Sequence, residues 1–409
     1  LDEMVDVAKD MEKRGMSIPL LIGGATTSRI HTAVKIAPTY PSGNSVHVLD
    51  ASRSVNVVGK LLGGEAQQFK DEVAAENEQM RERHNNKRST KEYITIDQAR
   101  ENKPDIDWEN SSLIKPGFLG TEVFEDYSLK ELRPYIDWTP FFQTWQLKGK
   151  YPAIFEDEVI GDEAKRLFND ANEMLDKIIQ EQWLTARGVL RFFPANAVGD
   201  DIELYTDDER REVLETLHTL RQQNKKAQNR PNYALSDFVA PRESGLKDYM
   251  GAFAVTAGLG IEQYAEKYEQ DNDMYNSILL KALADRFAET FAERLHERVR
   301  KEFWGFAPNE NLSSEELISE NYQGIRPAPG YPACPDHTEK GRIFDLLDAP
   351  NKANIELTDS YSMYPAAAVS GLYFSHPESR YFALGNIGRD QVEDYARRKG
   401  IDLETMEKW

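Results

Sequence analysis

The chain has 409 residues, which is enough for two or three domains of ordinary size. Hydrophobic residues make up 40% of it and aromatic residues 10%, a composition that excludes global disorder. A formal net charge of −20 argues against a nucleic-acid partner, because phosphate binding needs clustered lysine and arginine. The sequence has no run of about 18 apolar residues, so it predicts no membrane-spanning helix.

Residues 1–62 alternate between helical and strand patterns. The chain opens on Leu1 inside an amphipathic helix that ends at Gly15, without Met, an N-cap or a signal peptide, so we expect a fragment of a longer protein. Apolar runs at 18–22 and 45–49 predict buried strands, each followed by a helix. This order is typical of a parallel α/β sheet, and two strands correspond to half of such a domain.

Small residues follow both predicted strands. Gly23 and Gly24 end the first strand, and Ala51 comes shortly after the second. A tight strand-to-helix turn is the simpler explanation for the two glycines alone. Because ligands bind at the carboxyl ends of parallel strands, the three residues together suggest a groove.

The composition changes near residue 70. Residues 71–92 are rich in Glu, Arg, Lys and Asn and predict a solvated helix or a charged linker between a domain at 1–70 and a second domain at 93–409. In the second domain, long helices and short strands do not alternate strictly, so we expect an α+β fold. Helices are predicted at 163–181, 276–303 and from a capping box at Asp390 and Glu393 to Gly400, and strands at 188–193, 202–205, 369–374 and 381–384.

The segment Arg326–Lys340 reads RPAPGYPACPDHTEK and cannot be a helix or a central strand, because it holds four prolines. A stiff, extended loop offers its backbone groups at fixed positions, and a guanidinium at its start suits a ligand carboxylate. Cys334 and His337 have a metal-like spacing, but Cys334 is the only cysteine, so we expect neither a metal site nor a disulfide. The single thiol fits a reducing cytoplasm.

Other candidate residues have a simple structural alternative. Asp137 lies among five large aromatic residues, where a carboxylate needs a cationic partner such as a ligand ammonium. Tyr381 and Phe382 fit a packed strand as well as a pocket wall, and Glu289 fits a solvated helix face. No local Ser-His-Asp or Cys-His arrangement stands out, so the chain does not look like a self-contained acid–base catalyst.

Several segments resemble the cobalamin-dependent methionine synthases, and together they span nearly the whole chain. Two of them, IPLLIGGATTSRIHTAVKIAP and VHVLDASRS, resemble the end of the cobalamin-binding domain. Others resemble the activation domain, among them YIDWTPFFQTWQLKGKYP, RGVLRFFPAN, GAFAVTAG, NYQGIRPAPGYPACPDHTEK and SGLYFSHPESRYF. The resemblance implies a partial Rossmann-like cobalamin domain at 1–85, followed by an α+β activation domain with long helices and a twisted antiparallel sheet.

Members of this family transfer a methyl group from 5-methyltetrahydrofolate to homocysteine through cobalamin, cycling through methylcobalamin. The resemblance implies that this part binds S-adenosylmethionine and supports the reductive remethylation of inactive cob(II)alamin, with flavodoxin or a flavoprotein reductase as electron donor. The implied S-adenosylmethionine-binding residues are Asp137, Glu289, Arg326, Ala328, Gly330, Tyr331, Tyr381 and Phe382, and those facing cobalamin are Gly23, Gly24 and Ala51. The cobalt-ligating Asp-x-His-x-x-Gly motif is absent from the chain, and zinc belongs to family modules that it lacks.

Two alternatives stay open on the sequence. The chain could be a non-catalytic module that docks a reductase and the cobalamin domain, which differs from the first reading in not binding S-adenosylmethionine. An ordinary S-adenosylmethionine-dependent methyltransferase is less favoured, because the second domain lacks a glycine-rich loop after its first strand.

Overall fold

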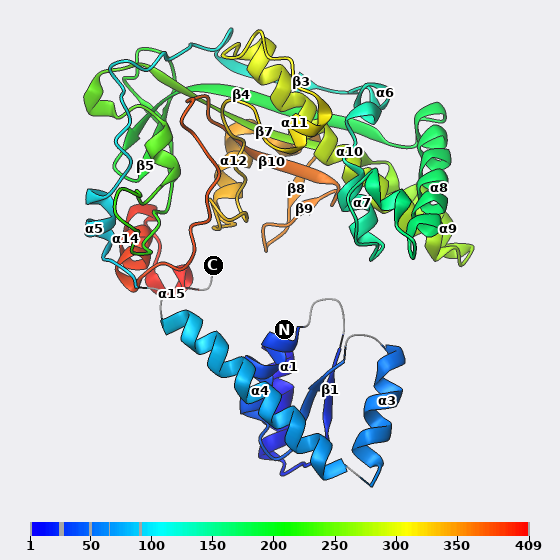
Figure 1. Ribbon diagram of the computed structural model, residues 1–409. Helices are drawn as coiled ribbons and strands as arrows, with labels where there is room; N and C mark the ends of the chain where they lie inside the picture. The colour runs from blue at the N-terminus through cyan, green and yellow to red at the C-terminus, as the bar shows by residue number, and fades with distance from the viewer. Residues whose placement is uncertain (1, 24–27, 49–50, 65, 90–91, 408–409) are drawn as a thin grey trace. The chain divides into compact units, whose positions relative to one another are not determined.

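The computed structural model describes residues 2–23, 28–48, 51–64, 66–89 and 92–407. It divides into two compact units, Leu1–Glu92 and Tyr93–Trp409 (Figure 1). Among the described residues, no helix combines the length and the apolar composition that crossing a bilayer requires.

The first unit contains the predicted parallel strand pair. Strands β1 (Leu20–Ile22) and β2 (Ser45–His47) run parallel, with Leu21 opposite Val46. Helix α1 (Asp2–Lys13) ends before Gly15, whose φ of +67° explains why glycine follows it. A small core joins α1 to β1 and the segment between the strands, through Ala8, Ile22, Ile36 and Tyr40. The α/β class expected for this part is confirmed.

The charged segment, for which we expected a solvated helix or a linker, is mostly helical. Helix α4 (Ala66–Ser89) follows α3 (Ala51–Leu62) and belongs to the first unit. Its Asn77 side chain donates a hydrogen bond to the Ser45 carbonyl oxygen of β2 (3.0 Å). The high charge of this segment therefore marks a solvated helix that is tied to the small sheet at one side.

The second unit is built on a six-stranded antiparallel sheet. Its order is β10-β7-β4-β5-β6, and β3 also pairs with β4. The strands are β3 (Gly120–Phe124), β4 (Thr185–Val198), β5 (Asp201–Tyr205), β6 (Val213–His218), β7 (Asp248–Leu259) and β10 (Ala368–Tyr373). The α+β class with an antiparallel sheet, expected from the sequence, is confirmed.

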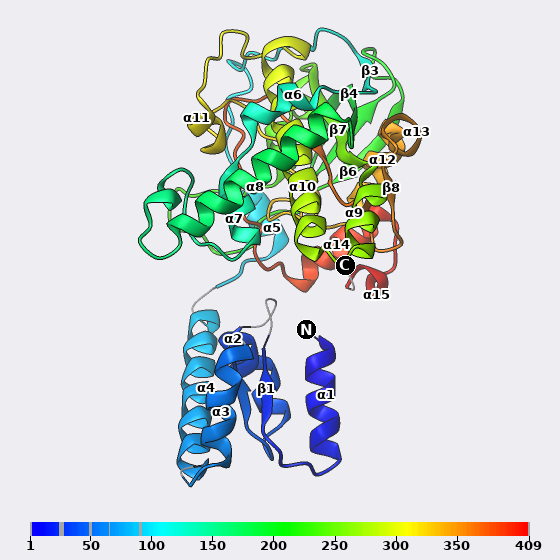
Figure 2. The same ribbon diagram turned by 90° about the vertical axis from the view of Figure 1, so that its right-hand side faces the viewer.

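Both faces of the central strands are buried. Along β4, Leu190 and Phe192 belong to one hydrophobic core, whereas Val189 and Phe193 belong to the other, because successive side chains point to opposite faces. The first core packs against the long helices α8 (Gly161–Gln180) and α10 (Met274–Arg298), which lie in front of the sheet in Figure 2. The second core packs against α12 (Glu339–Leu347) and α13 (Ala349–Ala353).

Shorter elements complete the second unit. Helix α10 continues as a π-turn over Val299–Phe303, so the predicted helix 276–303 is present with an irregular last turn. The remaining helices are α5 (Ile96–Glu101), α6 (Leu129–Leu132), α7 (Trp138–Thr144), α9 (Ile261–Gln270), α11 (Ser314–Ile318), α14 (Arg389–Lys399) and α15 (Leu403–Met406), and the pair β8 (Glu356–Leu357) and β9 (Met363–Tyr364) forms a two-stranded sheet.

Two local predictions are wrong. Residues 381–384 form no strand but a segment without regular secondary structure, in which the Leu384 amide donates to the Pro332 carbonyl oxygen (2.8 Å). Helix α14 has no capping box, because its N-cap is Gly388, and Asp390 instead accepts a hydrogen bond from the Ile96 amide (2.7 Å). The predicted end of this helix at Gly400, with φ of +69°, is confirmed.

Candidate functional site

Two adjoining cavities in the second unit share three charged side chains, Glu289, Glu320 and Arg326. The larger cavity, of about 500 Å³, is otherwise lined mainly by apolar and aromatic residues: Phe253, Pro327, Ala328, Tyr331, Pro332, Ala333, Val369, Tyr381, Phe382 and Ala383. The smaller cavity, of about 360 Å³, is more polar and is also lined by Tyr135, Asp137, Pro140, Arg286, Thr290, Glu293, Leu317 and Ile318. Together they combine an apolar compartment with a charged one.

The proline-rich loop reaches the larger cavity because it is fastened to the end of β10. Ile325 and Phe374 exchange two backbone hydrogen bonds of 3.0 Å, and the Leu372 amide donates to the Pro327 carbonyl oxygen (2.9 Å). A Cβ on Gly371 would lie 2.8 Å from that same oxygen, so this close approach requires glycine. The loop therefore holds Arg326 and Ala328 over the sheet edge.

Arg326 is held by two contacts. Its Nη1 pairs with the Glu293 carboxylate at 2.6 Å, and its backbone amide donates to the Tyr381 hydroxyl oxygen (2.9 Å). Burial alone would lower the pKa of Arg326, but the negative charge of Glu293 more than offsets this and keeps the pKa above its usual value. The guanidinium that the sequence suggested for a ligand carboxylate is thus charged and already paired through Nη1.

Gly330 acts within the turn and does not line either cavity. Its φ is +96°, and a Cβ at this position would lie 2.4 Å from His337 Cε1, so no other residue fits. Its amide donates to the Cys334 carbonyl oxygen (2.7 Å), which closes the turn that presents Tyr331 to the larger cavity. His337 itself contacts Lys340 Nζ through Nδ1 (3.1 Å).

Asp137 lines the smaller cavity as the N-cap of α7. Its carboxylate accepts a hydrogen bond from the Thr139 amide (2.9 Å). From the sequence we expected that the Asp137 carboxylate, placed among aromatic residues, needs a cation. The first turn of α7 already supplies one hydrogen-bond donor to it, so a cation is not its only possible partner. One carboxylate oxygen carries this bond, and the residue still borders the cavity.

Two glutamates that the sequence analysis did not single out belong to the same site. Glu293 lies one turn after Glu289 on α10, and Glu320 precedes the proline-rich loop by six residues. The spacing of Glu289 and Glu293 places both on one face of the helix, a signal that was available in the sequence. Glu320 has no such signal, because only the fold of residues 319–326 brings it beside Arg326.

The structure thus gathers seven of the eight predicted S-adenosylmethionine-binding residues at the two cavities. Asp137 lines the smaller one, Glu289 and Arg326 line both, and Ala328, Tyr331, Tyr381 and Phe382 line the larger one. Gly330 supports the turn behind them. Their role in ligand binding remains a prediction at this point.

The residues predicted to face cobalamin are only partly visible. Gly23 follows β1, and a Cβ there would lie 3.2 Å from the Val48 carbonyl oxygen, so the backbone after β2 already favours a small residue at this position. Gly24 lies outside the described residues, and Ala51 is described only as the first residue of α3. The described residues of the first unit therefore give no independent support for a cobalamin site.

Comparisons with known proteins agree on one family. Residues 128–400 match the vitamin B12 dependent methionine synthase activation domain. The crystal structure of the MetH reactivation domain bound to AdoHcy is 57% identical in sequence, with a TM-score of 0.76, and the match covers 78% of this chain and 97% of that one. The chain therefore belongs to the vitamin B12-dependent methionine synthases, and its residues 128–400 are their activation domain.

Proposed function

We propose that the second unit binds S-adenosylmethionine across the two cavities, with the ligand carboxylate at Arg326. The observation that carries this proposal is the convergence of Arg326, Ala328 and Tyr331 from one loop with Glu289 of α10 and Tyr381 around a single cavity. The 57% identical relative is bound to AdoHcy, the demethylated form of the same compound. A shared fold at this identity supports a shared ligand class.

The chemistry of the walls matches the parts of this ligand. Aromatic and proline side chains of the larger cavity suit the adenosine, whose rings bind through apolar contact. Glu289, Glu320 and Asp137 offer carboxylates to the sulfonium and the ammonium. Because carboxylates outnumber guanidinium groups here, the site favours a ligand with net positive charge, as S-adenosylmethionine has.

The activation domain would then serve the family's reductive remethylation of inactive cob(II)alamin. A bound cobalamin would supply the cobalt that accepts the methyl group, and this chain's residues would hold and orient the methyl donor. We also propose that flavodoxin or a flavoprotein reductase donates the electron for this reaction. The whole enzyme would transfer the methyl group from 5-methyltetrahydrofolate to homocysteine. Both rest on the family membership.

Titration calorimetry on the 409-residue chain tests the proposal. The chain should bind S-adenosylmethionine, and Arg326→Ala should weaken binding by about 1.5–3 kcal/mol, the usual worth of a hydrogen bond to a charged group. Arg294→Ala is the matched control: Arg294 and Arg326 are both 20% exposed and ion-paired, but Arg294 lines neither cavity.

Two outcomes would overturn the proposal. No measurable heat with the intact chain would favour a docking module that binds only a reductase and the cobalamin domain. Methyl transfer from S-adenosylmethionine to another acceptor, without a corrinoid, would favour an ordinary methyltransferase.

A further inference from the structure

We infer that Glu293 is a positioning residue for the proposed ligand site: it holds one edge of the Arg326 guanidinium so that the other edge meets the ligand carboxylate. The inference rests on the proposed function. Glu293 Oε2 lies 2.6 Å from Arg326 Nη1. The second oxygen, Glu293 Oε1, is buried and has no partner among the described residues, so this carboxylate has Arg326 as its sole observed partner.

The two residues differ in how firmly their side chains are held. The Arg326 backbone is fastened beside β10, but its long side chain has several rotatable bonds between the backbone and the guanidinium. Glu293 lies within the 25-residue helix α10, whose buried face packs on the sheet through Phe287, Phe291 and Leu295. A group on a rigid helix can therefore fix the position of one on a loop.

The contact leaves part of the guanidinium available. Nε and Nη2 of Arg326 have no hydrogen-bonding partner among the residues that the structure describes, whereas Nη1 is taken by Glu293. Arg326 lines both cavities, and Glu293 lines only the smaller one. Since a guanidinium is planar and its N–H groups form a rigid fork, holding Nη1 restricts the directions in which the free donors can point.

Glu293 acts on Arg326 in two ways, by its charge and as a hydrogen-bond acceptor. Its charge opposes a ligand carboxylate, and its acceptor oxygen orients the guanidinium. Glu293→Gln and Glu293→Ala both remove the charge, but only alanine also removes the acceptor. The difference between the two variants therefore isolates positioning from charge.

The experiment measures the binding of two ligands to the full chain and to both variants. We expect Glu293→Ala to bind S-adenosylmethionine about tenfold more weakly than Glu293→Gln, because the alanine variant loses a charge-assisted orientation of Arg326. Decarboxylated S-adenosylmethionine lacks the group that Arg326 would bind, so the two variants should bind it equally, within about twofold. Glu297→Ala is the control on the same helix, since Glu297 is comparably buried and pairs with Arg294 and Lys301.

Equal binding of S-adenosylmethionine by the alanine and glutamine variants would overturn the inference and leave Glu293 with a purely electrostatic effect. An equal loss for both ligands in Glu293→Ala would show a general structural role and would also overturn it. Thermal unfolding of each variant shows whether a loss of ligand affinity is caused by misfolding of the variant. If the wild-type chain binds no S-adenosylmethionine, the proposed function itself fails, and the inference fails with it.

Discussion

Glu289 and Glu320 are the two carboxylates that line both cavities. Burial raises the pKa of Glu289 above its ordinary value of 4.5, and the positive charges of Arg286 and Arg326 offset only part of the shift. Burial likewise raises the pKa of Glu320, against the opposing effect of Arg326. Both side chains are therefore protonated at a higher pH than an exposed glutamate would be.

This shift predicts a pH dependence that differs between two ligands. As the pH falls from neutral toward the ordinary glutamate pKa of 4.5, protonation removes negative charge beside the proposed position of the sulfonium, so S-adenosylmethionine binding should weaken by about tenfold. S-adenosylhomocysteine has a neutral thioether and should lose clearly less affinity. Calorimetry at several pH values compares the two, and Glu320→Gln should reduce the difference. Parallel losses for both ligands would show that these carboxylates do not act on the sulfonium.

Single residues were predictable where their role is local. Gly15 and Gly400 follow helices with positive φ, and the prolines and Gly330 of residues 326–340 specify a stiff turn. Arg326 stood out because it begins that turn. Its partner Glu293 shares a helix face with Glu289, but a pair of glutamates on a helix is equally typical of a solvated face, and only the tertiary packing places Glu293 2.6 Å from Arg326.

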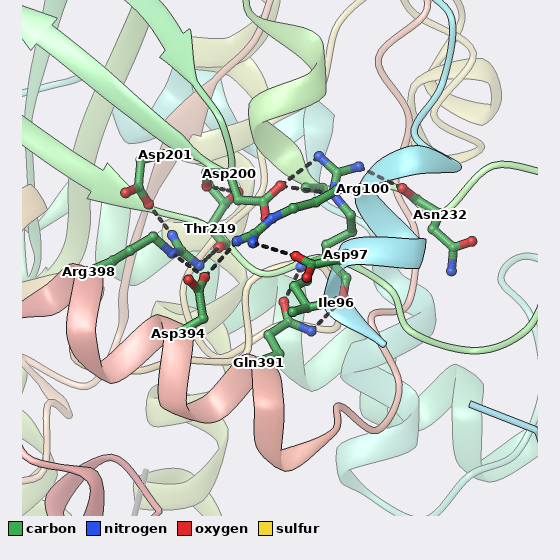
Figure 3. Close-up of polar contacts among 12 residues, drawn as sticks. Ile96, Asp97, Arg100, Asp200, Asp201, Thr219, Asn232, Gln391, Asp394 and Arg398 are labelled. Carbon is green, nitrogen blue, oxygen red and sulfur yellow. Dashed lines mark hydrogen bonds and ion pairs between the residues drawn. The ribbon is translucent and has the colours of Figure 1, made fainter. Parts of the chain in front are cut away.

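At the scale of elements, helix α14 joins distant parts of the second unit. Asp394 on this helix accepts a hydrogen bond from Arg100 of α5 (2.6 Å), and Arg100 also pairs with the buried Asp200 at 2.7 Å (Figure 3). From the same helix, Lys399 Nζ contacts Asp336, Thr338 and Glu339 at 2.6 Å each. Helix α14 thus holds the end of the proline-rich loop as well as the first helix of the unit.

The Lys399 contacts predict a large stability effect. Its side chain is 5% exposed, and Asp336 and Glu339 are each 4% exposed. Lys399→Ala would leave the buried Asp336 without its cation and Glu339 with only the longer contact to Arg342 Nε (3.4 Å), so we expect the free energy of unfolding to fall by about 3–5 kcal/mol. Urea denaturation of the full chain measures this change.

Arg389→Ala provides the control on the same helix. Arg389 pairs with Glu393, and the two side chains are 72% and 54% exposed, so the loss should stay below about 1 kcal/mol. If Lys399→Ala and Arg389→Ala lowered the free energy of unfolding equally, burial of the Lys399 ion pairs would not increase their contribution to stability.

At the scale of the whole molecule, the chain consists of two units with separate hydrophobic cores. The core of the first unit is formed by Ala8, Ile22, Ile36 and Tyr40, and the three other cores contain only residues beyond 105. All residues that line the two cavities of the candidate site belong to the second unit. The second unit thus contains the complete candidate site.

This division predicts that residues 93–409 suffice for ligand binding. Expressed alone, they should unfold cooperatively and bind S-adenosylmethionine with a Kd within about twofold of that of the full chain, because a domain with its own core folds by itself. Calorimetry and thermal unfolding of both forms provide the measurement. A large loss of affinity in the shorter form would show that residues 1–92 contribute to the site.

The sequence by itself determined the fold classes, most element positions and the loop that carries Arg326. These depend on local patterns: apolar periodicity specifies strands and helices, and proline and glycine restrict the backbone wherever they occur. Only the tertiary structure decided that residues 381–384 are not a strand, that Asp390 bonds to Ile96 and does not cap its helix, and that Glu293 and Glu320 lie beside Arg326. Each of these outcomes depends on a contact between residues far apart along the chain or on the path of a loop, and a local pattern contains no information about such contacts.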